Sequence, residues 1–193
     1  MCIRDRYSAV KGVDKDILVG VSPQGNMENN YEYMYADVKK WCSEEGYIDY
    51  ICPQIYFGYE NSVKPYEDTL QQWADICTTD VTLVAGLGVY KIDSESEFSE
   101  NIGIIGRQIN DAVVSYNYAG AAVYGYASLF GGSDRGVQEQ ECIEIAFDKL
   151  DTSVKWYVIY KLWYVKCKQI VIYYYKIYGS CLLYTSDAAD EAR

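Results

Sequence analysis

Residues 48–56 read Ile48-Asp-Tyr-Ile-Cys-Pro-Gln-Ile-Tyr56, a largely apolar and aromatic run that is typical of a strand buried on both faces. Three further runs of this kind occupy residues 17–22, 82–89 and 120–128. The four runs start 31, 34 and 38 residues apart, at residues 17, 48, 82 and 120. This spacing suits a strand–helix–strand crossover unit, so the sequence predicts four parallel strands.

Between these runs, apolar side chains recur at helical spacing. Tyr66, Leu70, Trp73 and Cys77 follow one another at steps of four, three and four residues, and a similar stripe runs over residues 98–113. Shorter patterns predict helices over residues 34–42, ending near Gly46, and 137–150, and both Trp41 and Trp73 are expected in the core. Alternating strands and helices predict an α/β fold, either a doubly wound sheet or a closed (β/α)8 barrel. No phosphate-binding GxGxxG or Walker sequence follows a predicted strand.

The barrel is favoured by the residues at the carboxyl ends of the predicted strands, where such barrels carry their chemistry. Gln54 and Tyr56 lie two residues apart and therefore point the same way, as do Tyr124 and Tyr126. Amides and phenols can hydrogen-bond sugar hydroxyls, and aromatic rings can stack on sugar faces. The candidate ligand-binding residues are Ser22, Asn26, Gln54, Tyr56, Tyr90, Lys91, Tyr124 and Tyr126. Each group has a structural alternative. Gln54 and Tyr56 could belong to a hydrogen-bonded network in the barrel core, and residues 22–26 could form a structural turn. Tyr90 and Lys91 could be a rim tyrosine beside a solvated lysine.

The strand ends resemble those of the glycosyl hydrolase-like 10 family. The matching pieces are residues 20–25, 49–56, 86–90 and 125–130, and the resemblance covers roughly residues 9–150. It implies the C-terminal half of a (β/α)8 TIM-type barrel that acts on a carbohydrate, in a protein that is exported or located in the cell envelope. It also implies a glycoside hydrolase fragment that is inactive alone, because the family's N-terminal half, which is not expected in this chain, carries an Asp-Asp-Tyr strand end of the active site. A non-catalytic carbohydrate-binding barrel and an unrelated α/β binding domain are the alternatives.

Glycoside hydrolysis usually requires two carboxyl groups about 5–10 Å apart. The strand ends contain no convincing pair, so the catalytic residues are unknown from the sequence. Glu28, Glu60 and Asp93 follow strands and are candidates for contact with substrate, with solvated loop carboxylates as the alternative. Asp49 begins its strand, at the end away from the chemistry, and is expected to have a structural role.

Composition excludes several other functions. The 17 basic and 28 acidic residues give a net charge of -11, which argues against a nucleic-acid partner. The absence of histidine excludes histidine bases and histidine metal clusters, and the seven cysteines have no metal-ligand spacing, so we expect no metal and no cofactor. The cysteines are expected to be small buried side chains. No apolar run is long enough to span a membrane.

The ends of the chain differ in composition from its middle. Residues 1–8 and 181–193 resemble translated sequencing adaptors, and residues 154–180 hold five lysines and no acidic residue. We therefore expect residues 9–150 to form the half barrel and residues 151–180 to be an out-of-frame tail that packs poorly. Four strands leave two open sheet edges, so self-association through these edges is expected.

Overall fold

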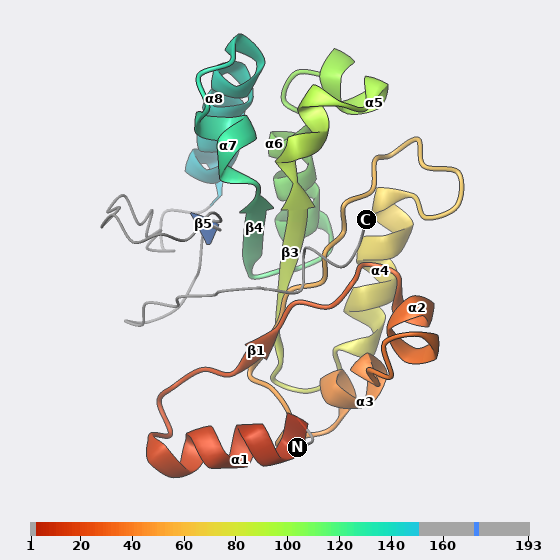
Figure 1. Ribbon diagram of the computed structural model, residues 1–193, viewed down its shortest axis with the longest axis vertical. Coiled ribbons are helices and arrows are strands. Elements are labelled where there is room, and N and C mark those ends of the chain that lie inside the picture. Colours follow the sequence, from red (N-terminus) through yellow and green to blue (C-terminus); the bar gives the residue numbers. More distant parts are fainter. Residues whose placement is uncertain (1–2, 151–171, 174–193) are drawn as a thin grey trace.

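The computed structural model describes residues 3–150 and the backbone of residues 172 and 173. Strands β1 (Gly20–Val21), β2 (Tyr50–Ile51), β3 (Thr82–Gly88) and β4 (Gly120–Tyr124) lie side by side in sequence order. All three neighbouring pairs are parallel. The α/β prediction is confirmed: four parallel strands alternate with helices, as in part of a (β/α)8 barrel (Figure 1).

The strands are shorter than the sequence predicts because proline interrupts two of them. Pro23 follows β1 and Pro53 follows β2, and proline has no N–H group to donate to a neighbouring strand. Parallel pairing resumes one residue later, where Gln54 bridges both Gln24 and Gly86. The four strand ends therefore stay aligned beyond the short strands. The predicted strand 120–128 is wrong in its second part, because β4 ends at Tyr124 and helix α7 (Tyr126–Phe130) follows.

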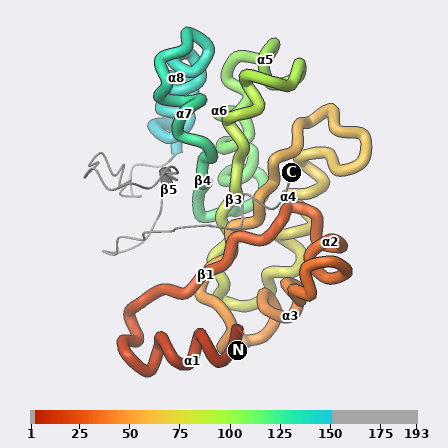
Figure 2. The backbone as a smooth tube through the Cα atoms, in the orientation of Figure 1, coloured from red at the N-terminus to blue at the C-terminus, as the bar shows by residue number. Residues whose placement is uncertain are grey.

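Helices surround the strands, as the chain trace in Figure 2 shows. Among the described residues they are α1 (Ile3–Val13), α2 (Met27–Glu32), α3 (Val38–Ser43), α4 (Tyr66–Ile76), α5 (Ser96–Glu100), α6 (Ile104–Asn110), α7 and α8 (Asp134–Lys149). In Figure 2, α4 and α6 run alongside the strands, α5, α7 and α8 lie beyond the upper ends of β3 and β4, and α1 lies below β1. Short 3-10 and π turns, Val89–Asp93 and Asp111–Ser115, follow β3 and α6. The single helix predicted over residues 98–113 is wrong. It is divided between α5 and α6 by Gly103, whose φ of 85° is left-handed.

The main core lies between the sheet and its helices. Leu83, Ala85 and Leu87 of β3 point into it and meet buried side chains of α4 and α6. The intervening β3 residue Val84 belongs to a small cluster with Cys52 and Ala122 on the opposite face of the sheet. Trp73 is fully buried, as expected. Trp41 is half-buried and packs against the core.

A buried carboxylate joins α8 to the start of α6. Glu139 is fully buried, and its carboxylate accepts hydrogen bonds from the backbone N–H groups of Gly103 (2.9 Å) and Ile105 (2.7 Å). Arg135 forms an ion pair with it at 2.7 Å. The carboxylate thus satisfies unpaired amides at a helix start and balances their positive dipole.

The sheet has a fifth strand, which corrects one expectation. β5 (Ile172–Tyr173) pairs antiparallel with β4, with Ala122 opposite Tyr173 and Val123 opposite Ile172. The expectation of an unpaired outer edge on the last barrel strand is therefore wrong, while β1 lies at the other sheet edge. The prediction that residues 154–180 pack poorly otherwise concerns residues outside those described. No helix within the described ranges has the length and apolar character needed to cross a bilayer.

The first described residues pack on the sheet. The Tyr7 hydroxyl of α1 donates to Asp49 at 3.0 Å, and the Lys11 ammonium lies 2.9 Å from the same carboxylate. Asp49 also accepts from the Val19 backbone N–H at 2.6 Å. Asp49 thus has the structural role expected of it, at the amino end of β2.

Candidate functional site

Three tyrosines meet at the carboxyl ends of three successive strands, and we call Tyr56, Tyr90 and Tyr124 the tyrosine cluster. The Tyr56 and Tyr124 rings are nearly parallel, 8° apart in plane, with centroids separated by 6.1 Å. Tyr90 meets both edge-on, at centroid distances of 5.9 Å to each. These geometries are favourable for aromatic pairs. Residues that lie 34 positions apart in sequence (56 and 90, 90 and 124) therefore form one aromatic surface.

The cluster depends on a glycine at the end of β3. A Cβ atom on Gly88 would lie 2.9 Å from the Tyr90 ring and 3.1 Å from the Tyr56 ring. The missing side chain leaves the space in which the two rings meet. Tyr90 remains 38% exposed, and partial burial, together with the nearby Glu95 carboxylate and Tyr124, raises its pKa. The hydroxyl of Tyr90 therefore stays protonated at neutral pH.

Gln54 and Ser22 lie one step deeper in the sheet. The Gln54 side-chain amide donates to the Ser22 carbonyl (3.2 Å) and to the Ser22 hydroxyl (3.4 Å). Ser22 also hydrogen-bonds the buried Cys52 thiol, although burial dominates and raises the pKa of Cys52 to about 12. The amide of Gln54 is thus held in place by the neighbouring strand end, and both residues remain half-buried.

The loop after β1 is fixed by a buried asparagine that sequence reasoning did not single out. The Asn30 side chain donates to the Gln24 carbonyl (2.7 Å) and accepts from the Gln24 N–H (3.1 Å). The indole of Trp73 donates to the Gly25 carbonyl at 2.8 Å. Asn26 is the N-cap of α2, and its side-chain oxygen accepts from the N–H groups of residues 28 and 29. The signal available in the sequence was the Asn-rich stretch at the start of a helix.

Two of the predicted site residues make their contacts outside the tyrosine cluster. Lys91 forms an ion pair with Glu95 at 2.8 Å, and its ammonium lies 5.5 Å from the centre of the Phe98 ring. Tyr126 begins α7 and stacks on Phe130, with ring centroids 4.8 Å apart. The prediction that Tyr124 and Tyr126 share one face is wrong, because the strand ends between them.

The loop carboxylates have varied surroundings. Glu28 forms an ion pair with Lys64 at 2.6 Å, and the hydrogen bond from Lys64 lowers the pKa of Glu28. Glu60 and Asp93 are exposed. Glu97, which sequence reasoning passed over, accepts from the backbone N–H groups of Tyr59 (2.5 Å) and Glu60 (3.2 Å) and so ties two strand-end loops together.

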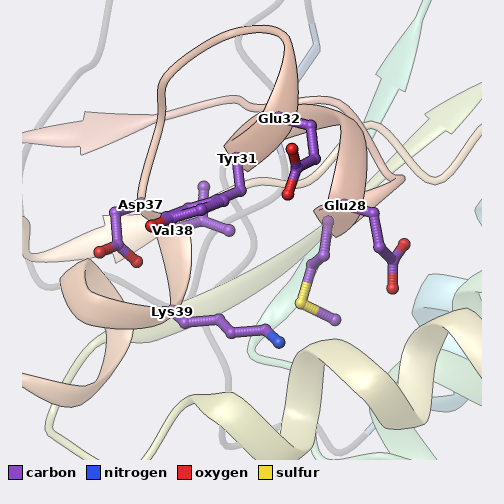
Figure 3. Close-up of a pocket in the computed structure, with 7 residues that line it drawn as sticks. Glu28, Tyr31, Glu32, Asp37, Val38 and Lys39 are labelled. Carbon is purple, nitrogen blue, oxygen red and sulfur yellow. The ribbon is translucent and has the colours of Figure 1, made fainter.

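A separate hollow lies between α2 and α3. It has a volume of about 240 Å³. Figure 3 shows Glu28, Tyr31 and Glu32 projecting from α2, with Val38 and Lys39 on α3. None of the tyrosines of the cluster lines this hollow, so it is distinct from the strand-end site.

Comparison with known proteins finds one family and several relatives that this chain resembles. The sequence model of the family described as "Glycosyl hydrolase-like 10" matches residues 3–102. A protein named "Glycosyl hydrolase DigH" of Escherichia coli K12 is 30% identical over 127 residues, which are 54% of this chain and 29% of that protein. "Glycosyl hydrolase YngK" of Bacillus subtilis strain 168 is 30% identical over 108 residues, 48% of this chain and 21% of that protein. The chain thus spans less than a third of the length of these relatives.

Proposed function

The chain belongs to the glycosyl hydrolase-like 10 family, and from this membership we propose that its strand-end face binds a carbohydrate chain as part of a glycoside hydrolase site. The single observation that supports this most is the tyrosine cluster. It offers ring faces and hydroxyl groups from three neighbouring strands at the end of the sheet where barrel enzymes act. Flat apolar rings with polar edges suit sugar rings, which have apolar faces and polar rims.

Each residue has a separate part in this proposal. Tyr56 and Tyr124 provide the stacking surface, and Tyr90, which is more exposed, provides a ring edge and a protonated hydroxyl. Gln54 presents its amide to the sugar from a position fixed by Ser22. The substrate class is an oligosaccharide or polysaccharide, with cell-envelope or environmental polysaccharides as the first to test.

We assign this chain the sugar-positioning part of the site and leave the catalytic acid and base to residues outside it. Three strand-end carboxylates already have partners: Glu28 has Lys64, Glu95 has Lys91, and Glu97 has two backbone N–H groups. A general acid needs a raised pKa, whereas the pKa of Glu28 is lowered. We therefore expect the 193-residue chain to bind glycans without hydrolysing them.

Calorimetric titration of the whole chain with oligosaccharides of glucose, xylose and N-acetylglucosamine, and with cell-envelope glycan fragments, tests the proposal. Tyr56→Ala should weaken binding of the best ligand about tenfold, because it removes one ring face and loosens the two remaining rings. Product analysis of the same mixtures should show no cleaved glycosidic bonds.

Tyr33→Ala is the matched control, because Tyr33 is 73% exposed and lies outside the tyrosine cluster. It should bind as the unchanged chain does. Equal losses in both variants, or no binding by the unchanged chain to any member of the panel, would contradict the proposed site. Released sugar that depends on Glu28, Glu60 or Asp93 would instead place a catalytic acid in this chain.

A further inference from the structure

Two cysteines that are distant in sequence meet at the end of the sheet opposite the tyrosine cluster. Cys42 is the penultimate residue of α3, and Cys77 is the C-cap of α4. Both helices lead into the next strand, so their carboxyl ends lie at the amino ends of β2 and β3. Figure 1 shows α3 beside the lower end of α4. The two thiols are joined by a hydrogen bond although the residues are 35 positions apart (42 and 77).

The backbone around the pair is also held together. The Thr79 hydroxyl, two residues after Cys77, donates to the Cys42 carbonyl at 2.9 Å. Both cysteines contribute to the main core, where Cys42 is fully buried and Cys77 is half-buried. Small reagents can therefore reach the half-buried Cys77 thiol, whereas the Cys42 thiol is shielded from solvent.

We propose that Cys42 and Cys77 form a redox-active pair that closes to a disulfide, with Cys77 as the reacting thiol and Cys42 as the resolving thiol. The oxidant is a peroxide. The Cys77 thiolate attacks one oxygen of hydrogen peroxide, the O–O bond breaks, and Cys77 becomes a sulfenic acid while hydroxide leaves. The Cys42 sulfur then attacks the Cys77 sulfur, the S–O bond breaks and water leaves. Two thiols and one peroxide thus become one disulfide and two waters.

The electrostatics of the pair agree with this division of roles. The hydrogen bond from the Cys42 thiol lowers the pKa of Cys77, whereas the same hydrogen bond and burial raise the pKa of Cys42. A thiolate is the nucleophile in such reactions, and it forms more readily on the sulfur that accepts the hydrogen bond. The pair lies away from the strand-end site, so its oxidation is measured as a change in the stability of the chain. The redox proposal does not depend on the proposed carbohydrate binding.

Peptide mapping of the full chain after mild peroxide treatment tests the proposal. Chymotryptic digestion without reductant should yield residues 42–47 joined to residues 74–83. Cys77→Ser should abolish this cross-link. Cys42→Ser should instead accumulate a sulfenic acid at Cys77 that dimedone captures, because the resolving thiol is missing. Cys42→Ala serves the same purpose should the serine perturb the core, and circular dichroism of the reduced variants verifies their folding.

Thermal unfolding supplies the second measurement. The oxidised chain should melt about 5–10 °C above the reduced chain, because the disulfide restricts the unfolded state. Cys77→Ser should show no such difference, and Cys142→Ser, which alters a half-buried cysteine on α8, should behave as the unchanged chain does. A cross-link from Cys77 to a cysteine other than Cys42, or equal dimedone labelling of Cys142 and Cys77, would overturn the proposal.

Discussion

At the scale of single residues, polar side chains after a strand can serve a ligand or the backbone, and Asn26 shows how the two differ. In the sequence it follows a strand end and is a candidate for ligand binding. In the structure its side-chain oxygen accepts from the N–H groups of Glu28 and Asn29 at 3.1 and 3.3 Å. A residue that starts a helix already has a partner for its side chain, and periodicity alone does not reveal where a six-residue helix starts.

Replacing Asn26 separates these two roles. Asn26→Ala should lower the free energy of unfolding by about 1 kcal/mol, because the first turn of α2 loses its cap. Asn26→Asp keeps an accepting oxygen and should retain nearly the full stability. Urea denaturation measures both, and calorimetry with the best oligosaccharide should find binding unchanged in each. Lost binding in Asn26→Ala at unchanged stability would return Asn26 to the ligand site.

At the scale of elements, apolar spacing located the helices better than it located their breaks. The stripe from Phe98 to Val113 has regular helical steps, yet its member Ile102 is 58% exposed. The chain turns at Gly103, where φ is positive, and α6 then starts with its amides on Glu139. The stripe contains no hint of this break other than the glycine itself, because the partner carboxylate lies 36 residues further along the chain.

Two glycines of similar conformation allow a matched test of that break. Gly103 and Gly46 have φ values of 85° and 83°, so an alanine at either site carries a conformational cost of about 1–2 kcal/mol. A Cβ on Gly103 would also lie 3.2 Å from the Cys142 sulfur, whereas nothing lies within 4 Å of one on Gly46. Gly103→Ala should therefore lose more unfolding free energy than Gly46→Ala in urea denaturation. Equal losses of unfolding free energy would mean that α8 moves to accommodate the added methyl group.

At the scale of the whole molecule, most of what could be predicted from the sequence followed from the order of the strands. Four parallel strands in sequence order bring their carboxyl ends to one edge, which is why Tyr56, Tyr90 and Tyr124 meet. The side-chain partners of Lys91 and Tyr126 could not be predicted in this way, because each lies just beyond a strand, where a helical turn replaces the two-residue alternation. Pairing of β5 with β4 was equally hidden, since no period links residues 172–173 to the repeat.

The edge of β4 provides the last prediction, by amide hydrogen exchange. The Ala119 N–H donates to the carbonyl of Leu83 in β3 at 2.9 Å, so by alternation the Ala121 and Val123 amides also face β3. The Ala122 amide faces the opposite edge, where Tyr173 is its partner in register. With β5 in place, the Ala122 amide should exchange about as slowly as that of Ala121.

Protein concentration distinguishes β5 from a second molecule at this edge. An intramolecular strand protects Ala122 equally at low and high concentration, whereas edge-to-edge self-association protects it more as concentration rises. We expect no dependence, measured by NMR-detected exchange on the full chain at two well-separated concentrations, with Ala121 as the internal reference. Fast exchange at Ala122 at both concentrations would mean that the edge is open and that β5 does not close it. Protection that grows with concentration would restore the β4 edge as a self-association surface, leaving β1 as the second such edge.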